Sequence, residues 1–131
     1  MGQVYDVRGK FHFRNVEAAR KATEQWAQES HIQLSLEKFR GEGVDTNTLR
    51  GLVQAVFAGW KCTPFRFVGH SNGRFDIENR FNASYGWELV MVEWFEVMAP
   101  HLYDNSSLSI YPDSGYEMLT IKNGNVEWKG V

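Results

Sequence analysis

Four histidines and one cysteine are the residues best suited to acid–base or nucleophilic chemistry, but they form no recognisable motif. The histidines lie in separate segments without metal-ligand spacing, at His12, His31, His70 and His101. Cys62 follows the expected C-terminal end of a helix, where the dipole does not favour a thiolate, so we interpret it as a small buried side chain. The sequence has no Gly-rich phosphate loop, no G-x-S-x-G and no H-E-x-x-H. We expect no catalytic residue, metal or cofactor; the alternative is a small enzyme with His70 or His12 as its acid or base.

A second group of residues has the chemistry to bind phosphate. Basic side chains alternate with phenylalanines around Ser71-Asn72-Gly73, and residues 5–13 repeat this alternation. Cationic side chains hold phosphates and aromatic rings stack on bases, which makes nucleic-acid or nucleotide binding an alternative function. The candidate residues are Arg8, Lys10, Arg66, His70, Arg74 and Arg80. Asp76 and Glu78 share the expected outer face, however, and the net charge is −2, so an ordinary charged surface is the simpler interpretation.

The charged residues are distributed unevenly along the chain. Residues 1–86 contain 12 basic and nine acidic residues, whereas residues 87–131 contain two basic and seven acidic residues. Such an asymmetry can steer a partner of opposite charge before contact. Three of the acids lie on a helix predicted for residues 84–99.

This helix has more apolar surface than contact with a single core requires. Its expected core arc consists of Trp87, Val90, Met91, Trp94, Val97 and Met98. At about 100° per residue, Leu89, Val92 and Phe95 fall instead on the side of the acids. Either the loop 101–107 covers Val92 and Phe95, or a protein partner or a second copy of the chain does.

These features predict a non-enzymatic protein-binding module that docks an acidic, aromatic surface on a basic protein partner. The expected partner-binding residues are Glu88, Val92, Glu93, Phe95, Glu96, Asp104, Tyr111, Asp113 and Tyr116. Homodimerisation through the helix is a further alternative. In size and texture the chain resembles small accessory proteins, including immunity proteins and phage-encoded inhibitors of host defence. This resemblance implies an inhibitor or immunity-type role and assigns no residue a function.

The first half of the chain is predicted to alternate strands and helices. Alternating apolar residues predict a strand over residues 5–13 with a bulge at Gly9. Asn15 is the expected N-cap of a helix that runs to about residue 29, and a shorter alternation predicts a second strand over residues 32–37.

A second helix is expected next, with an apolar stripe at Leu49, Leu52, Val53, Val56, Phe57 and Trp60. Asp45 or Thr46 is its expected N-cap, and Gly59 suits its C-terminal end.

Residues 64–81 are predicted to form a hairpin. A three-residue loop at Ser71-Asn72-Gly73 would pair His70 with Arg74 and place Phe67 and Ile77 on one apolar face. We favour this loop because a two-residue Asn-Gly loop would place Phe67 opposite a glutamate.

The end of the chain is predicted to be a three-stranded meander over residues 108–111, 116–122 and 125–129. A type I′ turn at Asn123-Gly124 would place Leu119 opposite Trp128 and Ile121 opposite Val126. We assign all five tryptophans to core packing: Trp26, Trp60, Trp87, Trp94 and Trp128.

A chain of 131 residues with 43% apolar residues can form one core, so we predict a single domain over residues 1–131. The order β-α-β-α-β-β-α-β-β-β predicts an α+β fold, with an antiparallel or mixed sheet and helices packed on one face. A single cysteine and the lack of a leader or membrane-spanning segment lead us to expect a cytoplasmic protein without membrane contact.

Overall fold

The strand β1 (Gly2–His12) is the central element of one antiparallel sheet, and its residue alternation matches the prediction. The computed structural model describes residues 2–29, 32–58, 67–71, 73–84, 86–112 and 117–129. Tyr5, Val7 and Phe11 point into the core, whereas Arg8 and Lys10 are exposed on the other face.

Gly9 lies within β1 without the predicted bulge. The pairing of β1 with β3 (Arg74–Ser84) is continuous, and Gly9 lies opposite Ile77. A β-carbon at Gly9 would lie 2.3 Å from Cζ of Phe11, which no real β-carbon tolerates. Gly9 therefore allows the Phe11 ring to lie against the β1 backbone. This close contact between ring and backbone explains why a glycine stands at position 9.

Over the described residues the sheet has six strands in the order β2-β3-β1-β4-β5-β6, and all neighbouring strands are antiparallel. The remaining strands are β2 (Phe67–Ser71), β4 (Ser107–Pro112), β5 (Glu117–Lys122) and β6 (Asn125–Lys129). β3 and β4 both run antiparallel to β1, so they are parallel to each other with β1 between them. By the same reasoning β1 and β2 are parallel with β3 between them. Two split β-α-β units are thus interleaved, as in the ferredoxin-like arrangement, and β5 and β6 extend the sheet.

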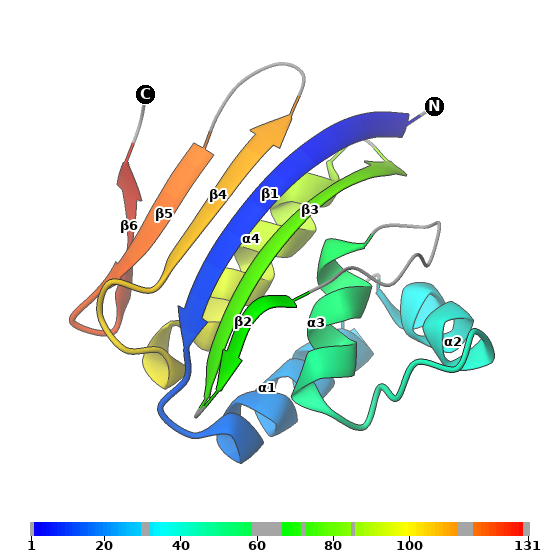
Figure 1. Ribbon diagram of the computed structural model, residues 1–131, viewed down its shortest axis with the longest axis horizontal. Helices are drawn as coiled ribbons and strands as arrows, with labels where there is room; N and C mark the ends of the chain where they lie inside the picture. The colour runs from blue at the N-terminus through cyan, green and yellow to red at the C-terminus, as the bar shows by residue number, and fades with distance from the viewer. Residues whose placement is uncertain are drawn as a thin grey trace.

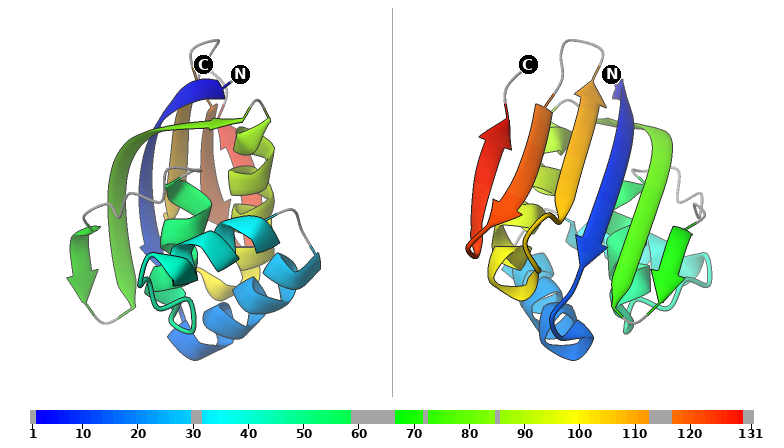
Figure 2. Two further views of the ribbon diagram at one scale, coloured as in Figure 1. Left: turned by 90° about the vertical axis from the view of Figure 1, so that its right-hand side faces the viewer. Right: turned by 60° about the vertical axis from the view of Figure 1, so that its left-hand side comes forward.

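The described helices lie on one face of this sheet, and no described helix covers the other face, which we call the open face (Figures 1 and 2). They are α1 (Val16–Glu29), α2 (Gln33–Gly41), α3 (Leu49–Phe57) and α4 (Trp87–Met98), followed by the 3₁₀ turn η2 (Ala99–His101). α1 contacts both α3 and α4, while α2 packs on α3 at the side of the molecule. The predicted α+β class, with helices on one face of an antiparallel sheet, is confirmed.

The strand predicted over residues 32–37 is wrong, because α2 occupies this segment. Ile32 and Leu36 fit a strand alternation, but with Phe39 they also follow the i, i+4, i+7 spacing of a helix. All three side chains are buried. Helical spacing therefore decides which residues of this segment reach the core.

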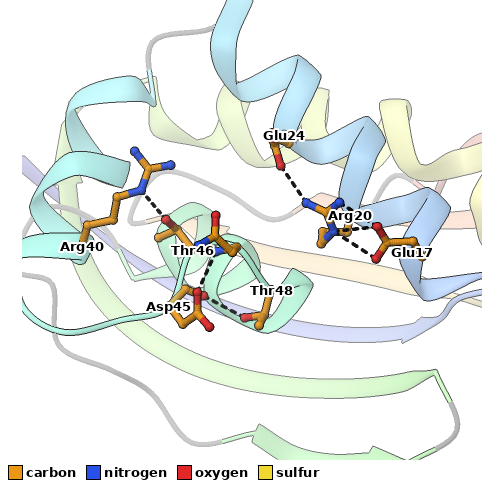
Figure 3. Close-up of polar contacts among 8 residues, drawn as sticks. Glu17, Arg20, Glu24, Arg40, Asp45, Thr46 and Thr48 are labelled. Carbon is orange, nitrogen blue, oxygen red and sulfur yellow. Dashed lines mark hydrogen bonds and ion pairs between the residues drawn. The ribbon is translucent and has the colours of Figure 1, made fainter.

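α3 begins later than predicted. Its N-cap is Thr48, whose Oγ1 accepts a hydrogen bond from the Gly51 backbone N–H at 3.1 Å. Asp45 instead accepts hydrogen bonds from Asn47 and Thr48 in the preceding turn, and buried Thr46 accepts one from Arg40 (Figure 3). The predicted C-cap Gly59 and the stripe residue Trp60 lie outside the described residues.

α1 begins where the sequence predicts. The Oδ1 of Asn15 accepts a hydrogen bond from the Ala18 N–H at 3.0 Å, which satisfies one free donor of the first turn. On its outer face Arg20 bridges Glu17 and Glu24, at 2.7 Å from each (Figure 3). Arg20 lowers the pKa of Glu17 chiefly by hydrogen bonding, and the two acids raise the pKa of Arg20.

The β2–β3 hairpin has a shorter loop than predicted. Ser71 pairs with Arg74, so two residues rather than three separate the strands, and His70 pairs with Phe75. An irregularity between Phe67 and Gly69 then shifts the register by one residue. Phe67 consequently lies opposite Ile77, so the apolar pairing is achieved by a bulge and not by the longer loop.

The C-terminal hairpin matches its prediction closely. Asn123 and Gly124 have φ angles of 53° and 75°, as a type I′ turn requires, and Leu119 pairs with Trp128. Leu119 and Ile121 are buried, but Trp128 is 55% exposed, so its assignment to the core is wrong. Trp128 lies on the last strand, at the edge of the sheet.

An aromatic cluster forms the centre of the core. The ring of Phe11 lies 5.0 Å from Trp94, 5.7 Å from Phe57 and 6.0 Å from Phe95, measured between centroids. Trp94 donates its Nε1–H to Thr23 of α1 at 3.1 Å, which satisfies this buried polar group. The cluster joins β1, α3 and α4, so these three elements share one packing unit.

Candidate protein-binding surface

α4 packs on the sheet and also contacts α1. It begins at Trp87 and not near residue 84, because β3 continues to Ser84. It ends at Met98, and Pro100 lies in the 3₁₀ turn that follows. This placement gives the helix two apolar neighbours, which accounts for its wide apolar surface.

Val92 and Phe95 are buried, so they are not available to a partner, and their prediction as contact residues is wrong. Phe95 packs on Phe11 of β1, so the sheet covers it, and not the protein partner, the second copy of the chain or the loop 101–107 that were the alternatives expected from the sequence. The buried side of α4 therefore includes Val92 and Phe95, whereas Trp87 and Val90 of the predicted core arc are only partly buried.

Two of the acids predicted to contact a partner instead accept hydrogen bonds from side chains of the same chain. Glu88 accepts a hydrogen bond from the hydroxyl of Tyr5, which is fully buried in the sheet. Burial and the neighbouring Glu88 carboxylate raise the pKa of Tyr5 to about 12. Glu93 is exposed and accepts a hydrogen bond from Nε1 of Trp26 on α1 at 2.8 Å. These acids therefore hold α4 against β1 and α1.

Glu96 is the acid of α4 that faces a groove. This groove, which we call the α4–β6 groove, has a volume of about 350 Å³. It is lined by Glu96, Ala99, Pro100, Gly124, Asn125, Val126 and Trp128. Glu96 and Trp128 are both exposed, so a carboxylate and a large aromatic ring lie at the same depression.

The open edge of β6 lies beside this groove. Asn125 pairs with Lys122 across the two-residue turn, and such a pair exchanges both backbone hydrogen bonds. By alternation, Val126 and Trp128 direct their backbone N–H and C=O groups away from β5. No strand among the described residues pairs with this side of β6. The edge can therefore accept an added strand.

Sequence reasoning missed Trp128 as a surface residue. Its position opposite Leu119 correctly indicated the helix-covered face of the sheet. The alternation of residues does not show, however, which strand lies at the edge, where the helix layer leaves a ring uncovered. The single signal was its place in the last predicted strand of a meander.

The other predicted contact residues do not join this groove. Tyr111 is 40% exposed and lies opposite Asp6 on the open sheet face. Asp104 is exposed, and its Oδ1 accepts a hydrogen bond from the Asn123 N–H at 3.0 Å. Asp113 and Tyr116 lie outside the described residues.

The alternative phosphate-binding residues lie on the open sheet face and are balanced by acids. Arg8 pairs with Glu78 at 3.7 Å, and Arg74 pairs with Asp76 at 3.3 Å. The strand register also places Lys10 opposite Asp76 and Arg80 opposite Asp6. The side chain of His70 and the whole of Arg66 lie outside the description.

This open face offers bases little to stack on. Along β1 and β3 its described side chains are polar or charged except Val4, and the phenylalanines of both strands point to the core. The described side chains of these two strands therefore offer no phenylalanine, tyrosine or tryptophan on which bases could stack, and Tyr111 on β4 is an exposed ring of this face.

The described part of the chain contains no cluster of three or more His, Cys, Asp or Glu residues able to hold a metal ion. Over the same residues, no helix is both long and apolar enough to cross a membrane. Comparison of the chain with known protein families, curated proteins and solved structures finds no match.

Proposed function

We propose that this protein binds another protein, without catalysis, by accepting an extended basic segment of its partner along β6 and the α4–β6 groove. The observation that carries the proposal is the exposure of Trp128 beside Glu96 at an unpaired strand edge. An added strand would form backbone hydrogen bonds with Val126 and Trp128.

The groove supplies the specificity that backbone hydrogen bonds lack. Exposed tryptophans are frequent energetic anchors of interfaces, because burial removes a large apolar ring from water. An apolar side chain of the added segment would pack on Trp128 and Pro100, and a lysine or arginine would lie near Glu96. The excess of acids over residues 87–131 favours the approach of a basic partner.

This proposal retains the basic protein partner expected from the sequence but changes the contact residues. Glu96 remains, and Trp128 replaces Val92 and Phe95 as the apolar anchor. An inhibitor or immunity-type protein would use such a surface to cover a basic site on its target.

A titration with a synthetic peptide of alternating lysine and valine tests the proposal, with the chain labelled for amide NMR. We expect saturable shifts of the Trp128 indole and of the amides of Val126 and Trp128. Trp128→Ala should weaken binding by about tenfold or more, because a tryptophan anchor is removed. Tyr111→Ala is the matched control, since it removes an exposed aromatic ring from the other sheet face.

A second arm tests the charge. Glu96→Gln should weaken binding of the lysine peptide, and Glu37→Gln, at an exposed site on α2, should leave it unchanged. Equal binding of a glutamate–valine peptide, or no saturable shift at Trp128, would contradict the proposal.

A further inference from the structure

A small polar pocket lies at the end of β1, apart from the residues that line the α4–β6 groove. We call it the β1 pocket; its volume is about 140 Å³. It is lined by Lys10, Phe11, His12, Arg74, Asp104, Asn105 and Ser106. The space corresponds to roughly four to five water molecules, enough for one small polar group.

The strand register brings the basic side chains of this pocket together. Arg74 begins β3 directly opposite His12, and Lys10 lies two residues earlier on the same face of β1. β4 begins at Ser107 opposite Lys10, so the preceding loop lies next to His12. Residues far apart in the sequence thereby line one hollow.

Backbone hydrogen bonds fix the loop that closes the pocket. The Tyr103 N–H donates to the carbonyl of His12 at 2.9 Å, and the His12 N–H donates to Oγ of Ser106 at 3.1 Å. The Asn105 N–H donates to the carbonyl of Ile121 at 3.1 Å, although Asn105 has a φ of 74°. A non-glycine residue held in this conformation indicates a loop whose shape its surroundings determine.

The polar groups of the pocket can converge as donors. The Ser106 hydroxyl accepts from His12 and keeps its own proton for donation. Arg74 directs Nε toward Asp76, and the hydrogen bonds found among the described residues leave its two Nη groups available. Lys10 has no ion pair among the described residues and contributes an ammonium group.

The charge at the pocket comes from two cations and two acids: Asp76 pairs with Arg74 and lies opposite Lys10, and Asp104 is in the lining. Lys10 and Arg74 line the pocket and provide its positive charge, and the ion pair with Asp76 engages only Nε of Arg74. Asp104 is the acid among the described residues of the lining, and its Oδ1 already accepts a hydrogen bond from the Asn123 N–H.

We propose that the β1 pocket binds a phosphate group, either as free phosphate or as the end of a phosphate monoester. Donors from β1, β3 and the closing loop line the pocket, and a phosphate, with its larger number of oxygens and higher charge, can accept more of them than a carboxylate. The pocket volume admits the phosphate and a few linking atoms, so a nucleoside or peptide would extend outside it. This proposal is independent of the protein-binding surface.

Amide NMR titration with inorganic phosphate, at constant ionic strength against chloride, tests the site. We expect saturable shifts at His12, Asn105 and Ser106. The double variant Lys10→Gln, Arg74→Gln should raise the Kd by about tenfold or more, since two charge-assisted hydrogen bonds are lost. Phosphoserine binding tighter than phosphate would identify the monoester as the ligand, and equal binding would identify free phosphate.

The double variant Arg8→Gln, Arg80→Gln is the matched control, because it removes the same charge from the same two strands outside the pocket lining. Its Kd should change less than about twofold, as expected for screened surface charges. Equal weakening by both double variants, or shifts that rise linearly without saturation, would overturn the proposal.

Discussion

The hydroxyl of Tyr5 donates a hydrogen bond to the carboxylate of Glu88, which joins the central strand of the sheet to the first turn of α4. Tyr5 is fully buried, and its ring packs 5.8 Å from that of Phe81 on the neighbouring strand. Glu88 is therefore an acid that the fold uses. Glu88 is one of the acids of residues 87–131, but its carboxylate accepts a hydrogen bond from a buried side chain instead of being free to contact a partner.

Stability should decrease between about pH 10 and pH 12 because of Tyr5. Its pKa is raised from 10.0 to about 12 in the folded chain, so the unfolded chain loses this proton first as the pH rises. The stabilisation is complete below pH 10 and is lost progressively up to about pH 12. Urea unfolding of the wild type and Tyr5→Phe across this range measures the difference. Parallel pH dependences of the two proteins would refute this role of Tyr5.

Gly9→Ala should destabilise the fold by about 1–3 kcal/mol, because the added carbon displaces the Phe11 ring from the aromatic cluster. Urea denaturation at neutral pH measures this change. Gly41→Ala is the control, since a β-carbon at Gly41 meets no atom within 4 Å. A cost at Gly9 no larger than that at Gly41 would show that the ring adjusts freely.

Thr23→Val should cost about 1–3 kcal/mol of unfolding free energy, because the buried indole N–H of Trp94 would lose its acceptor. Valine keeps the shape of threonine, so the change isolates the hydroxyl. Thr120→Val, on the open face of β5, should alter stability by less than about 0.5 kcal/mol. Thermal unfolding of the two variants distinguishes these sites, and equal shifts in Tm would argue against the hydrogen bond.

Thr48→Ala should cost about 1 kcal/mol, the usual loss when an N-cap acceptor is removed. Thr48→Asp should restore most of this stability, since a carboxylate can also accept from the Gly51 N–H. Denaturation midpoints of the three proteins test this order. If aspartate gives no recovery, the N-cap has been placed wrongly.

The sequence predicted correctly those elements whose residue pattern is compatible with only one local structure. β1 alternates over its whole length, Asn15 caps α1, and Asn123-Gly124 admits one turn type. The segment containing Ile32 and Leu36 failed because these two positions satisfy strand and helix spacing alike. Phe39 distinguishes the two structures, because it completes the helical spacing but lies beyond the residues 32–37 over which the strand was predicted.

The candidate surface was harder to predict because exposure depends on neighbours far away in the sequence. The pattern of α4 indicated burial on more than one side, yet only the fold shows that the sheet and α1 supply both contacts. Phe95 was therefore assigned to the surface and Trp128 to the core, and the structure reverses both.

The position of β1 also has a consequence for the order of events during synthesis. β1 leaves the ribosome before the other strands, but its neighbours begin only at Arg74 and Ser107. Both edges of β1 therefore wait for partners that lie far along the chain, and pairings over such distances form slowly. Until β4 emerges, β3 can pair with one edge of β1 while the opposite edge stays open to other chains. The arrival of β4 closes this edge, so β1 is paired on both sides only after Ser107–Pro112 has been added to the chain.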